Sequence, residues 1–398
     1  LVLARIVGGL GVGAALIIAP MYIAEIARAD SRGRMVSINQ LNIVVGISVA
    51  FFSNYLILKL GQSGTAWTQQ LSLDSASWRW MLGVELFPAV LYFVCLRFVP
   101  ESPRWLAMQG NSADARRVLE MFSTPEQAEI ELAAINQSLE SDIEKGASGF
   151  TTLLEPALRR VMVIGLVVAI LQQITGINAV FFYAPMIFEQ SGIGTDAAFM
   201  QAVLVGLTNL VFTVVAISLI DRIGRKPLLV FGVAGIATCM LMLSWGFSQA
   251  SYTINNDMLA ALADTATAAS LEPLLGNTYD SDLAFRAALI EQVGQGNFLK
   301  AESELLTGAI NIQAGIILVG ILGFVACFAV SIGPVMWVLF SELFPNRVRA
   351  LAISVVGLVN SAVSFLVQLM FPWQLANLGN ASTFMFFGIS ALIGLGFV

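Results

Sequence analysis

The chain has 398 residues and a formal net charge of −6, and its composition is 57% hydrophobic and only 12% charged. Soluble domains carry about 25% charged residues, so this composition excludes an ordinary water-soluble fold and indicates a protein that is solvated by lipid. The sequence contains no histidine, which excludes imidazole proton relays and the HExxH zinc proteases.

Nine apolar runs follow one another along the chain, and most are close to or longer than the roughly 20 residues that a helix needs to cross a bilayer. They cover residues 3–24, 38–58, 79–98, 161–183, 197–220, 227–247, 310–340, 350–371 and 382–398. We therefore predict nine transmembrane helices, the last one cut short at Val398. Because the chain begins with Leu1 inside an apolar run and without a charged segment before it, we expect a fragment that lacks material at both ends, not a signal peptide.

Two long polar segments separate these runs. Residues 107–155 favour short amphipathic helices, one of which is predicted to start at the capping box 124–127, with Pro125 in the first helical position. Residues 249–308 are acidic and helix-forming, and we expect them to be a solvated lid without a ligand of its own.

The basic residues are distributed unevenly between the two sides of the membrane. Fifteen of the twenty Lys and Arg residues fall in one alternating set of loops, four fall in the other set, and Arg5 lies inside a span. Cytoplasmic loops carry the excess of Lys and Arg, so the first set is predicted to be cytoplasmic. The segment 107–155 then lies inside the cell, and the insert 249–308 lies outside it.

Two cytoplasmic junctions share a pattern in which a glutamate is followed seven residues later by an arginine. The pairs are Glu25 with Arg32 and Glu342 with Arg349. Parallel repeats of membrane helices are common in secondary transporters. We predict that these residues, together with Arg225, form ion pairs that hold the two halves closed on the inner side. The alternative is that the arginines only anchor the cytoplasmic loops.

Four motifs, in this order along the chain, resemble the sugar porter family of the major facilitator superfamily, and in particular the bacterial xylose/hexose–proton symporters. They are Arg5 with the glycines of 8–13, PESPRWL at 100–106, QQITGIN at 172–178 and DRIGRKP at 221–227. The resemblance covers almost the whole chain except the 249–308 insert. It implies an all-α membrane protein with the major facilitator fold, in which the nine spans are the fourth to a truncated twelfth of twelve helices.

The domains expected on this basis are three. They are the C-terminal half of the N-terminal helix bundle at 1–106, a cytoplasmic amphipathic helical linker at 107–155, and the C-terminal bundle at 156–398 with its external insert.

Six amide side chains lie inside the apolar spans. They are Gln40, Gln172, Gln173, Asn178, Asn209 and Asn360. An unpaired amide in hydrocarbon costs several kcal/mol, so each must face a partner or a wet cavity. Amides suit sugars because each offers both donors and acceptors to a hydroxyl, and the alternative is hydrogen bonding between helices. The pair Thr175 and Gly176 is predicted to break the helix and to re-aim Asn178.

The resemblance implies that Gln172, Gln173 and Asn178 bind sugar, and Trp337 matches a further sugar contact of the family. An indole stacks on the apolar face of a pyranose, although an ordinary packed tryptophan is the alternative. Gly333 and the proline after it are predicted to break the helix and form a hinge. Phe182 and Ile47 replace a Tyr and a Gln of close relatives, so xylose itself is not implied.

Arg5 is predicted to be buried near the outer end of its span, where an unpaired charge is costly, and Glu85 is a candidate partner. In the resembling symporters an Asp on the first helix pairs with this arginine and carries the proton, and no such helix precedes Arg5 here. The hypothesis is that a carboxylate beside Arg5 is protonated from outside and releases the pair. A static ion pair is the alternative.

The sequence therefore predicts a secondary active transporter that moves a pentose or hexose by alternating access, coupled to protons. A sugar uniporter and a non-transporting nutrient sensor on the same scaffold stay open as alternatives. An enzyme is excluded because the spans hold no histidine and no clustered carboxylates, and a channel because no filter loop or ring of charge is found. The expected partners are sugar, proton and lipid bilayer, without cofactor, metal or nucleic acid, and a monomer is expected.

Overall fold

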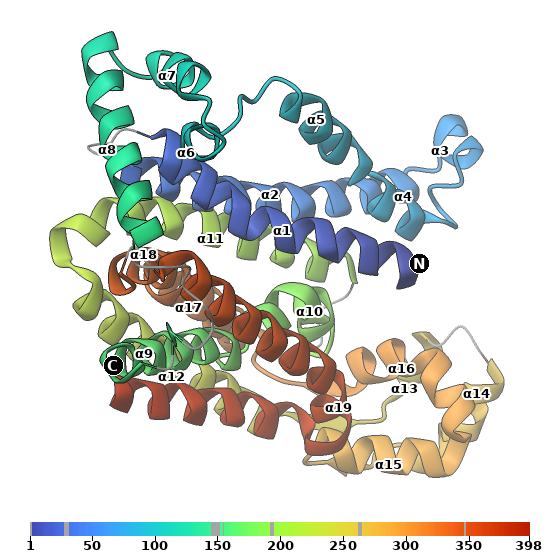
Figure 1. Cartoon of the computed structure of the whole chain (residues 1–398). Coiled ribbons are helices and arrows are strands. Elements are labelled where there is room, and N and C mark those ends of the chain that lie inside the picture. Colours follow the sequence, from blue (N-terminus) through green and yellow to red (C-terminus); the bar gives the residue numbers. More distant parts are fainter. Residues whose placement is uncertain are drawn as a thin grey trace. The chain divides into compact units, whose positions relative to one another are not determined.

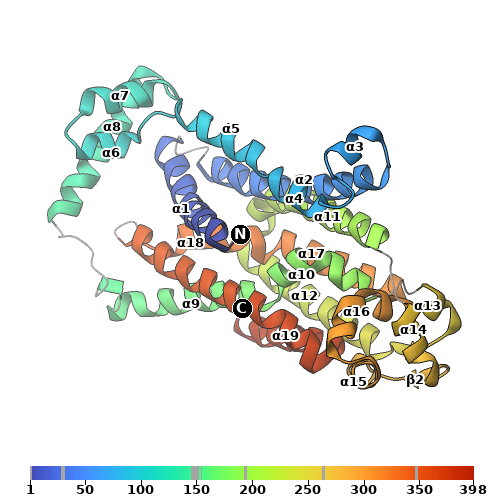
Figure 2. The same cartoon turned by 90° about the vertical axis from the view of Figure 1, so that its right-hand side faces the viewer.

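The computed structural model describes residues 2–27, 32–144, 152–153, 155–191, 195–261, 265–345 and 348–398. The chain divides into two compact units, which are described separately (Figures 1 and 2). Unit 1 consists of Leu1–Val45, Trp78–Val163 and Phe340–Val355. Unit 2 consists of Gly46–Ser77, Ile164–Leu339 and Val356–Val398.

Unit 1 is built from the first helices and the polar segment that follows them. Its elements are α1 (Val2–Ile26), the first part of α2 (Arg32–Gln62), nearly all of α4 (Ser77–Gly83), α5 (Leu86–Leu96), α6 (Pro103–Met108), α7 (Ser112–Glu120) and α8 (Pro125–Glu144). The C-terminal end of α1 is fastened to the start of α6. The Tyr22 hydroxyl donates to the carbonyl oxygen of Pro100 at 2.6 Å, and the Ser102 hydroxyl donates to the Glu25 carboxylate.

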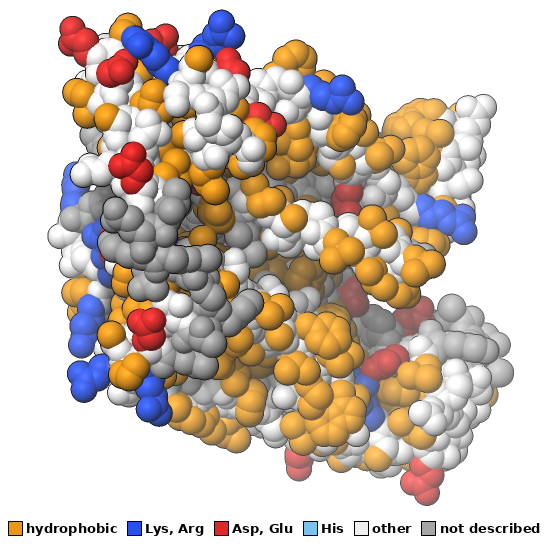
Figure 3. Space-filling model, in the orientation of Figure 1, with side chains coloured by type: hydrophobic (Ala, Val, Ile, Leu, Met, Phe, Trp, Pro, Cys, Tyr) orange, Lys and Arg blue, Asp and Glu red, His pale blue; other side chains and the backbone are white. Residues whose placement is uncertain are grey.

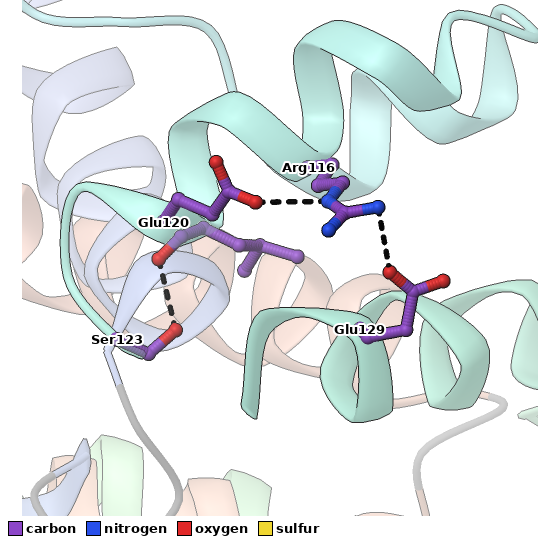
Figure 4. Close-up of polar contacts among 5 residues, drawn as sticks. Arg116, Glu120, Ser123 and Glu129 are labelled. Carbon is purple, nitrogen blue, oxygen red and sulfur yellow. Dashed lines mark hydrogen bonds and ion pairs between the residues drawn. The ribbon is translucent and has the colours of Figure 1, made fainter. Parts of the chain in front are cut away.

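The polar segment forms a small helical cluster of α6, α7 and α8, as its amphipathic pattern predicts. Ala115, Leu119, Ala128 and Leu132 make its apolar core. Across the surface of the cluster, Arg116 pairs with Glu120 and Glu129, each at 2.8 Å, and these carboxylates raise the pKa of Arg116 (Figure 4). Helix α8 begins at Pro125, which confirms the predicted start.

Unit 2 holds most of the remaining spans. They are the last part of α2, α3 (Ala66–Gln70), most of α9 (Pro156–Ile174), α10 (Ile177–Glu189), α11 (Thr195–Ile223), α12 (Arg225–Ser248), α17 (Ala314–Val330), α18 (Ile332–Leu343, up to Leu339) and most of α19 (Arg349–Phe397). Helices α12 and α17 approach closely because their contact contains glycine. A side-chain Cβ at Gly235 would lie 2.4 Å from the Cys327 sulfur, and one at Gly232 would lie 1.9 Å from the Ser331 hydroxyl.

Eight helices among the described residues are long and apolar enough to cross a membrane, so the predicted count of nine is wrong. The runs 350–371 and 382–398 belong to one element, α19, whose two legs meet at Gly379 with φ 78° (Figure 1). The non-helical backbone of Gly379 separates the two legs, which follow each other without an intervening loop. Two other runs are divided inside the membrane, one after Ile174 and one at Ser331.

The break after Ile174 is built on a glycine, as predicted. Gly176 adopts φ 87°, in the left-handed region that is costly for residues with a Cβ, and it stands at the N-terminus of α10. The Thr175 hydroxyl donates to the Gln172 carbonyl at 2.8 Å and so satisfies an acceptor at the end of α9. Asn178 therefore lies on a new helix, α10, and does not continue the face of α9 that carries Gln172.

The insert forms a small module of its own. It contains β1 (Ser251–Thr253), α13 (Asn256–Ala261), α14 (Thr265–Leu271), the 3-10 helix η2 (Glu272–Leu274), β2 (Thr278–Tyr279), α15 (Asp282–Val293), α16 (Gln295–Ala309) and β3 (Ile310–Asn311). The strands form an antiparallel sheet in the order β2-β1-β3, with Tyr252 opposite Tyr279 and Ile310. Tyr252, Phe285, Leu289 and Leu305 are buried in its core. The helices were predicted; strands of two or three residues are too short to leave a pattern.

Apolar side chains cover much of the exposed surface, as a lipid environment requires (Figure 3). On α5 and just after it, for example, Phe87, Phe93 and Phe98 are 76%, 63% and 81% exposed. In a soluble protein such a surface would promote aggregation, and here it faces acyl chains.

We expect Gly176→Ala to lower the unfolding temperature in detergent, because the left-handed conformation costs a residue with a Cβ about 1–2 kcal/mol. The new methyl group would also lie 2.9 Å from the Phe387 ring. Gly46→Ala is the matched control, since Gly46 is helical and a Cβ there meets nothing within 4 Å. Equal unfolding temperatures for both variants and the wild type would show that Gly176 is not a required joint.

Candidate binding site

Three buried amides from α9 and α19 hydrogen-bond to one another. Gln173 Nε2 donates to Asn360 Oδ1 at 2.9 Å, and Asn360 Nδ2 donates to Gln172 Oε1 at 2.8 Å and to the Ala169 carbonyl at 2.9 Å. Gln172 Nε2 reaches the Ile332 carbonyl of α18 at 3.5 Å. Residues that are far apart in the chain thus meet inside the bundle, and amides in hydrocarbon require such partners.

The hydrogen bonds continue toward α10 and along α19. Asn178 Nδ2 donates to Gln173 Oε1 at 2.7 Å and to Ser364 Oγ at 2.8 Å, and Gln368 Nε2 donates to the same Ser364 Oγ at 2.8 Å. We call these six residues (Gln172, Gln173, Asn178, Asn360, Ser364 and Gln368) the amide network. Its inner three members are buried, whereas Asn178, Ser364 and Gln368 are half-buried.

The amide N–H groups at the half-buried end of the network are used in hydrogen bonds, and acceptors remain there. Both N–H bonds of Asn178 and both of Asn360 are committed within the network or to backbone. Asn178 Oδ1 and Gln368 Oε1 accept no hydrogen bond from the residues that the structure describes, and Ser364 Oγ accepts two bonds and keeps its own proton. This end therefore offers two acceptors and one hydroxyl donor to a ligand that carries hydroxyl groups.

Four of the eight predicted binding residues meet in the network: Gln172, Gln173, Asn178 and Asn360. Asn209 on α11 is 4% exposed and forms no hydrogen bond within the described part of the chain. Gln40 is half-buried on α2, in unit 1. The structure therefore does not bring these last two residues into the network.

Gly333 and Trp337 lie on α18, whose first residue supplies the carbonyl next to Gln172. The predicted helix break is found at Ser331, just before Gly333. A Cβ at Gly333 would lie 2.9 Å from the Phe328 ring, so glycine is needed for the turn to pack. Trp337 is half-buried one turn further along.

Ser364 and Gln368 were not predicted. Together with Asn360 they recur every four residues on α19, which places them on one face of the helix. A polar stripe of period four in an apolar span is the signal that identifies such a face.

The predicted partner of Arg5 is confirmed in position, but its predicted burial is wrong. Arg5 Nη1 lies 3.8 Å from Glu85 Oε2 within unit 1, and the two side chains are 58% and 64% exposed. Most of the surface of α1 faces outward, so this pair is not enclosed by protein. In lipid the two charges would compensate each other.

The predicted gate residues make local contacts in the described regions. Glu25 accepts from Ser102, Arg349 Nε donates to the Phe344 carbonyl at 3.1 Å, and Arg225 Nη1 donates to the Ile220 carbonyl at 3.3 Å. Both arginines thus satisfy carbonyls near the ends of preceding helices. Glu342 is exposed, and the side chain of Arg32 lies outside the described residues, so the ion pairs stay a prediction.

No group of three or more acidic or cysteine side chains able to hold a metal ion is found among the residues described.

Comparison with known proteins gives consistent matches along the chain. The family model described as "Sugar (and other) transporter" matches residues 1–268 and 294–398. The arabinose-proton symporter of Bacillus subtilis (strain 168) is 32% identical over 398 residues, which cover 100% of this chain and 71% of that protein. The D-xylose-proton symporter of Escherichia coli (strain K12) is 32% identical over 398 residues, covering 98% and 66%. The partially occluded inward open structure of the xylose transporter XylE from E. coli gives a TM-score of 0.71 at 31% identity, covering 100% and 69%.

These matches confirm a helical membrane protein of this type and correct one part of the predicted fold. The assignment of nine helices as the fourth to a truncated twelfth of twelve is not supported, and the chain spans 66–71% of the length of these relatives. The alignments run over the whole chain, and the described residues hold eight spanning helices.

We expect Asn360→Ala to lower the free energy of unfolding by about 1–3 kcal/mol, because it removes the shorter hydrogen bonds of two buried amides and leaves Gln173 Nε2 and Gln172 Oε1 only their mutual bond at 3.3 Å. The measurement is thermal or denaturant unfolding in detergent. Asn377→Ala is the control on the same helix, since Asn377 is exposed and only donates to the Trp373 carbonyl. Equal destabilisation by the two changes would contradict a network held by Asn360.

Proposed function

The chain belongs to the sugar transporter family of the major facilitator superfamily, and from this premise we propose that it moves a monosaccharide, a pentose or a hexose, across the cell membrane by alternating access and in symport with protons. The observation that carries the proposal is the convergence of four amides from α9, α10 and α19. Transport, not catalysis, is what this family does, and the chain is a multi-pass membrane protein.

The chemistry of the network fits a sugar. Sugar hydroxyls donate and accept, and the half-buried end of the network offers two amide oxygens and the Ser364 hydroxyl. A neutral site also avoids burying a charge that the sugar does not compensate. Asn209, buried on α11 without a hydrogen bond in the described residues, is a further amide that a ligand would satisfy. Trp337 would supply the flat apolar surface for the ring.

The names of the two relatives favour a pentose as the first substrate to test, and hexoses belong in the same panel. We further propose that the protein acts as a monomer in the bilayer. The helices at 1–106 and 156–398 would be its two bundles, the 107–155 cluster its cytoplasmic linker, and the 249–308 insert would face the outside.

Proton coupling is assigned to the Arg5–Glu85 pair. A protonated Glu85 would lose its attraction to Arg5, which lies 3.8 Å away, and the loss would release α1 from the segment that carries Glu85. Protonation from the side of higher proton concentration would then favour one of two conformations. The following two experiments distinguish symport from uniport and from a non-transporting sensor.

We expect wild-type protein in proteoliposomes to show counterflow of a radiolabelled pentose or hexose. We expect Gln173→Ala to raise the KM by about tenfold or more, since each 1.4 kcal/mol of lost binding free energy weakens the affinity tenfold. Asn377→Ala is the matched control and should behave as wild type. Binding without counterflow in the wild type would identify a sensor. Unchanged kinetics in Gln173→Ala would remove the amide network from the proposal.

We expect Glu85→Gln to retain counterflow, which needs no net proton movement, and to lose uptake driven by an inward proton gradient. Glu120→Gln in the linker is the control, because it also neutralises an arginine's partner but lies outside the spans. Gradient-driven uptake that persists in Glu85→Gln would place the proton elsewhere. Uptake that a protonophore does not affect in the wild type would show uniport.

A further inference from the structure

Helices α10 and α19 lie side by side along a seam that starts at the amide network. At its inner end, Asn178 Nδ2 donates to Ser364 Oγ at 2.8 Å. One to two turns further along both helices, the rings of Tyr183 and Phe371 pack with centroids 5.2 Å apart. The seam therefore runs from the network toward the C-terminal end of α10 at Glu189 and the bend of α19 at Gly379.

Helix α10 has little backbone support of its own. It begins at the left-handed Gly176, which interrupts the hydrogen-bond ladder from α9, and Pro185 lacks an N–H inside the helix. A helix of 13 residues that is jointed at one end keeps its position by contacts along its side and at its other end. What holds that other end consequently limits how far α10 can swing about the Gly176 joint, along the seam where Asn178 contacts Ser364.

The insert contacts the far end of both helices. Thr307 Oγ1, on α16, donates to the carbonyl oxygen of Glu189, the last residue of α10, at 3.2 Å. Asp282, on α15, accepts from the backbone N–H of Asn380 at 3.1 Å, where the second leg of α19 begins. The approach requires glycine at the bend, because a Cβ at Gly379 would lie 2.6 Å from Asp282 Oδ1.

The two contact points are joined rigidly inside the insert. The ion pair between Arg286 and Glu302 ties α15 to α16, and the Arg286 guanidinium lies 5.9 Å from the centroid of the Phe298 ring. Tyr252 stacks on Phe285 at 5.3 Å. Burial, together with the nearby Asp282 carboxylate, raises the pKa of Tyr252, so its hydroxyl stays neutral within this contact. A force on one contact is therefore transmitted to the other.

The insert is also the part of the chain that departs from its family. The family model leaves residues 269–293 unmatched, and these include all of α15 with Asp282 and Arg286. Asp282 and Arg286 are each only 9% exposed, so the side of the insert that carries them is not open to solvent.

We propose that the insert is an external clasp in which Thr307 and Asp282 act as positioning residues, holding α10 against α19 and thereby holding Asn178 beside Ser364. The inference rests on the proposed transport function. Sugar that enters from outside must part this seam or pass beside it, and the clasp opposes that opening. Loosening the clasp raises the population of the conformation that accepts external sugar, which lowers the apparent KM without a matching rise in maximal rate.

The test uses Thr307→Val, which keeps the shape and removes the donor, and Asp282→Asn, which removes the charge. Thr253→Val is the matched control, because Thr253 lies in the same insert and its hydroxyl contacts only Thr278 at 3.1 Å. In proteoliposomes, we expect Thr307→Val to lower the apparent KM for external sugar by about two- to tenfold, the effect of one hydrogen bond. We also expect faster deuterium exchange of the amides at 184–189. Thr253→Val should change neither.

Two results would overturn the clasp. The first is that Thr307→Val and Asp282→Asn match Thr253→Val in both KM and exchange. The second is a lower maximal rate with an unchanged KM, which is the effect of a smaller amount of folded protein. If Asp282→Asn does not fold, Thr307→Val decides. Absence of counterflow in the wild type would refute the transport function, and the exchange rates of α10 would still decide whether the clasp exists.

Discussion

The hydrogen bonds that Asn360 makes with Gln172 and Gln173 are the constraint on which the arrangement of this bundle depends. In a bilayer the hydrophobic effect does not draw helices together, because acyl chains solvate apolar side chains as well as other helices do. Buried amides do not have that freedom, since each unpaired N–H or C=O in hydrocarbon costs several kcal/mol. The helices α9 and α19 must meet at this level, and their meeting fixes the register at which Ser364 and Gln368 face Asn178.

Glycine supplies the complementary constraint. At Gly232 and Gly235 it lets α12 and α17 approach more closely than any side chain would permit, and at Gly176 and Gly379 it lets the backbone turn where a Cβ would be strained. The same residue type therefore has two roles in this fold. In the first it supports a rigid scaffold, and in the second it creates the joints at which α10 and the second leg of α19 change direction. The network lies next to one joint and the insert lies on the other.

The sequence predicted the inner half of the site because an amide within an apolar span is rare and costly. It did not predict Ser364, because serine and threonine in membrane helices commonly bond the carbonyl four residues earlier, as Thr238, Ser354 and Ser390 do here. Residue type alone cannot separate such a serine from one that accepts from another helix. The exposure of Arg5 was also beyond reach, since hydropathy measures the cost of exposure and not how neighbouring helices pack.

The chemistry of the network separates sugar binding from proton binding. None of its six side chains takes up or releases a proton near neutral pH, so any dependence of transport on a proton gradient has to arise outside it. The Arg5–Glu85 pair lies in unit 1, whereas the network belongs to unit 2. Two ligands that bind different units can influence each other only through conformations that each of them binds with unequal affinity. In the proposed cycle, coupling therefore depends on the equilibrium between the conformations. The joints at Gly176 and Gly379 are positions in unit 2 where that equilibrium can be changed without altering the groups that contact the sugar.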